Sequence, residues 1–78
     1  MKITTKKCVH HYEIIKEEYE VRVQMKKGQI ITLRVDVEDG EIMSFGGKTK
    51  TDTKVIDKLT APQREILNDL IYEMGIDE

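Results

Sequence analysis

The chain has 78 residues, and its 13 basic and 15 acidic side chains leave a formal net charge of −2 at neutral pH. Hydrophobic residues make up 38% of the sequence, enough to cover one face of a small sheet and one helix but too few for a large catalytic cleft. The near balance of charges excludes a polybasic nucleic-acid arm and a strongly acidic tail. We therefore expect one small domain over residues 1–78.

The single cysteine, Cys8, excludes an internal disulfide framework, which favours stabilisation by packing in a reducing compartment. The longest uninterrupted apolar run, residues 70–72, is far shorter than the roughly 18 residues that span a bilayer. The first residues contain no apolar segment typical of a secretion signal. We expect a cytoplasmic protein without a membrane partner.

The N-terminal segment is predicted to be a strand. Cys8, His10, Tyr12 and Ile14 alternate along the chain, and the valine, histidine, tyrosine and isoleucine residues of this segment favour a strand modestly. A short helix over residues 7–17 is the alternative that the pattern leaves open.

Two neighbouring segments, residues 19–25 and 31–37, predict an antiparallel hairpin because apolar and polar residues alternate in both. The apolar positions are all odd-numbered: Tyr19, Val21, Val23, Met25, Ile31, Leu33, Val35 and Val37. Directly opposed residues share a face, so pairing odd with odd requires a loop with an odd number of residues. The simplest such loop is Lys27-Gly28-Gln29.

A second turn is predicted at Asp39-Gly40, a pair typical of two-residue type I′ turns. Such a turn opposes Val37 to Ile42 and points Met43 and Phe45 outward. A three-residue loop would reverse these faces, and counting apolar side chains favours that alternative. The turn chemistry favours Ile42 on the inner face, and the sequence leaves both registers open.

Residues 46–52 contain no apolar side chain and are predicted to form a loop. Val55, Ile56 and Leu59 then indicate a single helical turn that closes onto the core.

The C-terminal segment predicts a helix that begins at Ala61. Thr60 and Gln63 have the spacing of a capping box, and Pro62 lies in the first turn, where it breaks no helical hydrogen bond. Gly75 is placed to end the helix. Its apolar stripe consists of Ile66, Leu67, Leu70, Ile71 and Met74. The expected fold is α+β: an antiparallel meander of three to four strands with one C-terminal helix packed on one face.

The residues with catalytic or metal-binding chemistry form no complete motif. Cys8 and His10 would share one side of a strand with His11 adjacent, but a structural zinc site lacks a second cysteine or a third histidine, so carboxylates would have to complete it. Residues two apart on a strand are about 6.6 Å apart, beyond the reach needed to activate a cysteine nucleophile. We expect a protein that is not an enzyme and has no metal or other cofactor.

The segment at residues 45–49 ends in Gly47-Lys48-Thr49, like a phosphate-binding loop, but the position that requires the first glycine is Ile42. We therefore expect no nucleotide site. A small nucleic-acid-binding protein remains an alternative, using an exposed Phe45 and a lysine patch over residues 48–58. That patch would contain Lys48, Lys50, Lys54 and Lys58.

Residues 19–44 resemble the C-terminal hairpin of PepSY-type domains. The matching residues are Tyr19, Glu20, Val21 and Val23 on the first strand, and Val35, Asp36, Gly40, Glu41 and Ile42 around the second. This resemblance implies an inhibitory module as another alternative, although no helix is predicted before the hairpin.

The outer face of the C-terminal helix is the most distinctive surface. Its residues are Glu65, Asn68, Asp69, Tyr72, Glu73 and Asp77. The four carboxylates in this list repeat every four residues. Like charges at that spacing destabilise a helix slightly, so folding gains nothing from them. An exposed tyrosine among carboxylates suits an interface.

We therefore predict a small protein-binding module that presents this face to a partner with a basic surface. More specifically, we predict that the protein inhibits a host nucleic-acid-binding protein and that a phage or mobile element carries it. Direct binding of nucleic acid by this chain is less favoured. The protein itself would be a monomer or an edge-strand homodimer.

Overall fold

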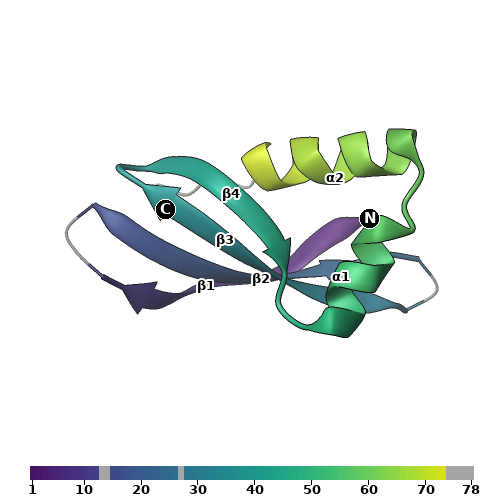
Figure 1. Cartoon of the computed structure of the whole chain (residues 1–78), viewed down its shortest axis with the longest axis horizontal. Helices are drawn as coiled ribbons and strands as arrows, with labels where there is room; N and C mark the ends of the chain where they lie inside the picture. Colours follow the sequence, from purple (N-terminus) through teal and green to yellow (C-terminus); the bar gives the residue numbers. More distant parts are fainter. Residues whose placement is uncertain (13–14, 27, 74–78) are drawn as a thin grey trace.

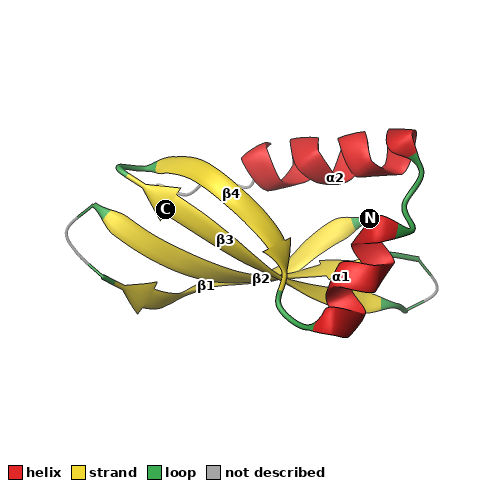
Figure 2. Cartoon of the chain, viewed as in Figure 1, coloured by secondary structure: helices red, strands yellow, loops and turns green. Residues whose placement is uncertain are grey.

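The computed structural model describes residues 1–12, 15–26 and 28–73. Four strands come first in the chain and two helices follow (Figures 1 and 2). The elements are β1 (Lys2–His11), β2 (Lys16–Gln24), β3 (Ile30–Glu38), β4 (Glu41–Gly47), α1 (Lys50–Asp57) and α2 (Ala61–Glu73). The strands form one antiparallel sheet in the order β1-β2-β3-β4. The predicted α+β meander is confirmed, and α1 is a second helix beyond the one expected.

The N-terminal segment is a strand, as predicted, and it pairs with β2 along its whole length. Two bulges interrupt this pairing, one between Ile3 and Thr5 and one between Cys8 and His10. Cys8 and His10 therefore lie on opposite faces of the sheet, so the prediction that they share one face was wrong. Ile14 lies outside the described residues.

The β2–β3 hairpin has the predicted pairing of odd with odd residues, with Val23 opposite Ile31. The loop lies one residue earlier than expected, because the Met25 amide donates a hydrogen bond to the Gln29 carbonyl at 2.7 Å. Gly28 adopts a φ of 78° at the last loop position. A left-handed residue at that position is typical of three-residue hairpin loops, and it explains the shift because only glycine adopts this conformation at no cost.

The β3–β4 turn resolves the two registers that the sequence left open. Asp39 and Gly40 both have positive φ, as a type I′ turn requires, and Val37 lies opposite Ile42. A bulge then shifts the register, so that Val35 lies opposite Phe45. Ile42 and Phe45 consequently both pack against the core. The prediction that Phe45 points outward was wrong, because one extra residue in an edge strand reverses every later face.

The core lies between one face of the sheet and the helices. Its buried residues are Tyr19, Val21 and Val23 of β2, Ile31, Leu33, Val35 and Val37 of β3, and Leu67 and Ile71 of α2. Figure 1 shows α2 lying over the sheet, with α1 between the end of β4 and the start of α2. The opposite face of the sheet, formed by the even-numbered residues of β2 and β3, is left without a helix.

Helix α2 begins at Ala61, as predicted, and has the expected capping box. The Gln63 amide donates to Thr60 Oγ1 at 3.3 Å, and the Thr60 amide donates to Gln63 Oε1 at 3.0 Å. The buried line is narrower than the predicted stripe. Leu67 and Ile71 are buried and Leu70 is half-buried, but 54% of Ile66 is exposed. Met74 and Gly75 lie outside the described residues.

Helix α1 is longer than the predicted single turn because a second capping box starts it. Thr49 Oγ1 accepts from the Asp52 amide, and the Asp52 carboxylate accepts from the Thr49 amide, both at 3.2 Å. The same carboxylate accepts from the Thr32 amide of β3 at 3.2 Å, just past the point where β4 ends. The Asp52 carboxylate thus accepts the hydrogen bond that a further residue of β4 would otherwise accept, and this contact links α1 to the sheet.

Candidate functional site

The predicted partner-binding residues gather on the outward side of α2. All five that the structure describes are exposed: Glu65, Asn68, Asp69, Tyr72 and Glu73. Asp77 lies outside the described residues. We call these five residues the acidic face. Its three carboxylates follow one another at intervals of four residues, which is a rise of about 6 Å along the helix.

The carboxylates of the acidic face differ in their partners from two carboxylates of β2. In the sheet, Glu18 pairs with Arg34 at 3.1 Å, and Glu20 pairs with Lys48 at 2.7 Å. Among the residues that the structure describes, no salt bridge or hydrogen bond engages the side chains of Glu65, Asp69 or Glu73. These charges are therefore available to a partner without first breaking a contact.

Tyr72 belongs to the last turn of α2, and its ring makes an edge contact with Phe45 of β4. Its exposed fraction is 53%, which agrees with its predicted position away from the core. Its ring centroid lies 6.5 Å from that of Phe45, with the planes 74° apart, an edge-to-face contact between α2 and β4. Because this contact restrains the ring, less side-chain entropy remains to be lost on binding.

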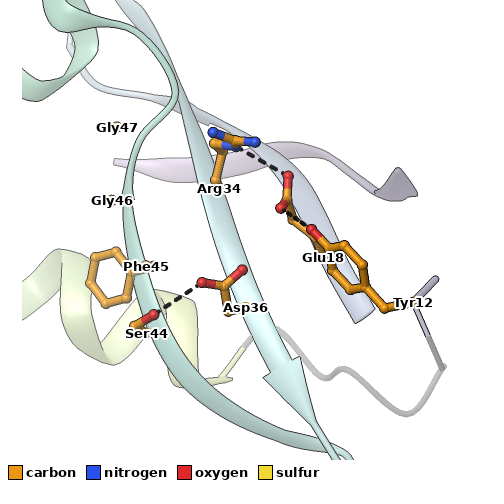
Figure 3. A pocket seen from close by; sticks show the side chains of 8 residues that line it. All are labelled: Tyr12, Glu18, Arg34, Asp36, Ser44, Phe45, Gly46 and Gly47. Carbon is orange, nitrogen blue, oxygen red and sulfur yellow. Dashed lines mark hydrogen bonds and ion pairs between the residues drawn. The ribbon is translucent and has the colours of Figure 1, made fainter. Parts of the chain in front are cut away.

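A second polar cluster lies on the face of the sheet that the helices leave open, and sequence reasoning missed it. Glu18 is only 9% exposed, and its carboxylate accepts from the Tyr12 hydroxyl at 2.8 Å and from Arg34 Nε at 3.1 Å. Beside them, the Ser44 hydroxyl donates to Asp36 at 3.2 Å (Figure 3). These side chains line a shallow hollow. Their even positions on neighbouring strands were the available signal for the strand residues, but the sequence contained no signal for the contact from Tyr12.

The electrostatics of this cluster stabilise it as a structural unit. The hydrogen bond from Tyr12 and the charge of Arg34 hold the pKa of Glu18 below its ordinary value, although burial opposes them. The same hydrogen bond raises the pKa of Tyr12. The Tyr12 hydroxyl and the Nε of Arg34 are thus both engaged by Glu18.

The four lysines of the alternative nucleic-acid site line two different hollows. Lys48, Lys50 and Lys54 line one hollow at the start of α1, whereas Lys58 lines another between the helices and the β2–β3 loop. Lys48 is also paired with Glu20, which lowers the pKa of that carboxyl. Phe45 packs against the core rather than standing exposed.

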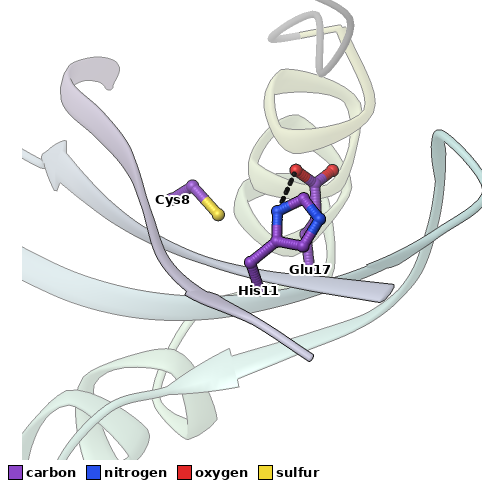
Figure 4. A group of neighbouring side chains, drawn as sticks. All are labelled: Cys8, His11 and Glu17. Carbon is purple, nitrogen blue, oxygen red and sulfur yellow. Dashed lines mark ion pairs between the residues drawn. The ribbon is translucent and has the colours of Figure 1, made fainter. Parts of the chain in front are cut away.

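The structure brings Cys8 together with a different histidine from the one that the alternation suggested. Because of the bulge after Cys8, His11 and not His10 shares its face, and Glu17 lies opposite His11 on β2. One ligand atom from each of Cys8, His11 and Glu17 lies within 4.8 Å of the others (Figure 4). A carboxylate therefore completes a three-residue cluster that the sequence did not predict.

Comparisons with known proteins found no matching family model, no matching curated protein and no matching solved structure. Within the described part of the chain, neither helix has the length and apolar character needed to cross a membrane.

Proposed function

We propose that the protein is a small non-enzymatic binding module that uses the acidic face of α2 to engage a basic surface of a partner protein. The observation that carries the proposal is the row of three exposed carboxylates, Glu65, Asp69 and Glu73, that repeats along α2 without a salt-bridge or hydrogen-bond partner among the described residues. Glu18 and Glu20 of the sheet have cationic partners. The ladder on α2 has no such partner among the described residues, and it lies on the side of the helix facing away from the core.

The chemistry of the acidic face suits a nucleic-acid-binding site as the target. Such sites carry spaced lysine and arginine residues that normally contact phosphates, and carboxylates repeated along a helix can compete for them. An inhibitor of a host nucleic-acid-binding protein, carried by a phage or mobile element and acting in the cytoplasm, is the specific version that we propose. The formal net charge of −2 confines the mimicry to one local surface.

The test compares two variants with the same change in net charge. The first neutralises the acidic face by Glu65→Gln, Asp69→Asn and Glu73→Gln. The control neutralises three acidic residues away from α2, by Glu38→Gln, Glu41→Gln and Asp57→Asn. Tagged forms of the wild type and both variants are used to capture proteins from the source organism at low and high salt, followed by mass spectrometry.

We expect a partner that the wild type and the control retain, that rising salt releases, and that the acidic-face variant binds at least about tenfold more weakly. Stability of the acidic-face variant should stay the same or rise slightly, because repulsion along the helix is relieved. The proposal fails if the acidic-face variant captures the same proteins as the wild type.

Tyr72→Ala separates binding from folding. As an interface anchor, Tyr72 should contribute about 2 kcal/mol or more to binding. Its loss should lower the free energy of unfolding by only about 1 kcal/mol, through the contact with Phe45. Equal losses in the partner affinity and in the denaturant melt would place Tyr72 in the core instead.

The two alternatives have weaker support. Direct binding of nucleic acid would rest on Lys50, Lys54 and Lys58 of α1 and its C-cap, because Lys48 is paired with Glu20. A steep fall with salt in the affinity for single-stranded DNA would favour it. For the PepSY-like module, the hairpin itself is present, but strand β1 precedes it rather than a helix.

A further inference from the structure

Cys8, His11 and Glu17 form a cluster whose geometry is independent of the acidic face. Cys8 and His11 belong to edge strand β1, and Glu17 belongs to β2 directly opposite His11. Figure 4 shows the Cys8 sulfur and the Glu17 carboxylate both turned toward the His11 ring. Cys8 is exposed, and the side chains of His11 and Glu17 are 58% and 26% exposed, so an ion can reach the cluster from solvent.

The bulge in β1 is what creates this arrangement. Without it, residues two apart would share a face, and Cys8 would face the same way as His10. The extra residue makes the spacing three, so Cys8 and His11 both point to the side of Glu17 and Tyr19. Bulges often re-aim a side chain in this way next to functional sites.

The distances fit a tetrahedral zinc ion. The His11 Nδ1 and Glu17 Oε2 atoms are 3.4 Å apart. Two ligands of tetrahedral zinc, at the usual bond lengths for nitrogen and oxygen, are also about 3.4 Å apart. A thiolate would lie about 3.6 Å from either one. Since no two ligand atoms are more than 4.8 Å apart, the sulfur needs to move by only about 1 Å, which rotation of an exposed side chain supplies.

The donor set is also the one that zinc prefers over calcium or magnesium. Those two ions take oxygen ligands, whereas thiolate, imidazole and carboxylate together suit zinc. We propose that Cys8, His11 and Glu17 bind one Zn²⁺ ion, with the fourth position open to water. Binding forms a bond between zinc and sulfur, and the thiol proton of Cys8 passes to solvent.

An ordinary surface ion pair between His11 and Glu17 would not account for the third member of the cluster, Cys8. The contact between His11 and Glu17 involves two groups, and the Cys8 thiol adds nothing to it. Within the described residues, the hydrogen bond that the thiol donates is a weak one, to the His10 carbonyl at 3.3 Å. The sequence-based expectation of no metal rested on an incomplete ligand set, and Glu17 brings the number of protein ligands to three.

The experiment titrates chelator-treated full-length protein with Zn²⁺, measured by calorimetry, and with Co²⁺, measured by absorption. We expect one ion per chain and a Co²⁺ spectrum with thiolate charge-transfer bands. His11→Gln and Cys8→Ser should each weaken Zn²⁺ binding by more than about tenfold. Even the loss of a residue that only hydrogen-bonds to a metal ligand costs about that much, and these two residues are ligands themselves. The matched control is His10→Gln, because His10 is adjacent but faces the other way.

A second measurement avoids dependence on the variants. The rate at which iodoacetamide alkylates Cys8 should fall when Zn²⁺ is added to the wild type and to His10→Gln, but not when it is added to His11→Gln. The proposal is overturned if the wild type binds no Zn²⁺ or if Zn²⁺ leaves Cys8 alkylation unchanged. It is equally overturned if His10→Gln weakens binding as much as His11→Gln.

Discussion

At the scale of single residues, Glu18 shows how a carboxylate is retained on an almost buried position. Its side chain lies on the open face of the sheet, where Tyr12 and Arg34 donate hydrogen bonds to it. A charged group left without such partners in this position would cost free energy. Glu18 precedes the alternating run of residues 19–25, and the sequence contained no signal that its side chain is covered.

The Tyr12–Glu18 contact makes stability depend on pH in a definite direction. The folded-state pKa of Glu18 is lowered, chiefly by the hydrogen bond from Tyr12, so its contribution is fully present above the ordinary carboxyl pKa. That contribution is lost as pH falls through the folded value. We expect the wild type to lose stability below about pH 4.

Tyr12→Phe removes the largest cause of the lowered pKa, so it should make this loss of stability on acidification shallower. Urea melts between neutral and acidic pH measure the effect. Tyr72→Phe is the control, since no hydrogen bond engages the Tyr72 hydroxyl within the described residues. Identical pH profiles for Tyr12→Phe and the wild type would contradict the role assigned to this hydrogen bond.

At the scale of elements, local signals predicted α2 better than they predicted its orientation. The capping box of Thr60 and Gln63 depends on four consecutive residues, and it fixed the start of the helix correctly. The same logic applied to Thr49 and Asp52 would have revealed α1. The predicted apolar stripe was wider than one docking surface can cover, so packing against the sheet decided that Ile66 stays exposed.

The observed orientation of α2 is testable by truncating side chains on the two sides of that stripe. Leu67→Ala should lower the free energy of unfolding by about 2–5 kcal/mol, because Leu67 is 1% exposed and its loss leaves a cavity. Ile66→Ala should change it by less than about 0.5 kcal/mol. Denaturant melts of both variants give the comparison, and similar losses would mean that α2 is rotated about its axis.

Gly47 marks the junction between β4 and α1. A Cβ atom at this position would lie 2.5 Å from the Thr53 backbone nitrogen, whereas at Gly46 it would meet nothing within 4 Å. Gly47, which matched the end of a phosphate-binding loop, thus differs from its neighbour Gly46 in its surroundings. Gly47 lets α1 approach the end of the strand.

We expect Gly47→Ala to destabilise the protein by about 1–3 kcal/mol, because backbone atoms of α1 must move. Gly46→Ala should leave stability unchanged or raise it slightly, through reduced freedom of the unfolded chain. Thermal or urea melts distinguish the two. A Gly47→Ala variant as stable as Gly46→Ala would show that α1 does not approach as closely as described.

At the scale of the whole molecule, the sheet was predictable and its irregularities were not. Alternation and the Asp39-Gly40 turn depend on neighbouring residues, so the meander and its order follow from the sequence. The bulges in β1 and β4 depend on how strands fit their partners, and each changed which side chains share a face. Two contacts follow from these bulges and could not be predicted from the sequence alone. They are the ring contact between Phe45 and Tyr72 and the proximity of His11 to Cys8.

The same bulges affect whether two copies of the protein can dimerise through their edge strands. The two edges of the sheet are β1 and β4, and an open edge is a template for a strand of another copy. Both edges are interrupted, β1 twice and β4 once, and β1 also presents the charged residues Lys2 and Lys7. Bulges and edge lysines are the features by which proteins resist such pairing.

Of the two oligomeric states that the sequence left open, we therefore expect the monomer. Light scattering after size exclusion should give a mass near 9.1 kDa, and the value should not rise with protein concentration. Metal-free buffer with a chelator is required, because an exposed ion with an open position can bridge two chains. A mass near twice that value in chelator would mean that an edge strand pairs despite its bulges. In that case, Met43→Pro on β4 and Val9→Pro on β1 would be compared, and the variant that restores the monomer would show which edge strand pairs.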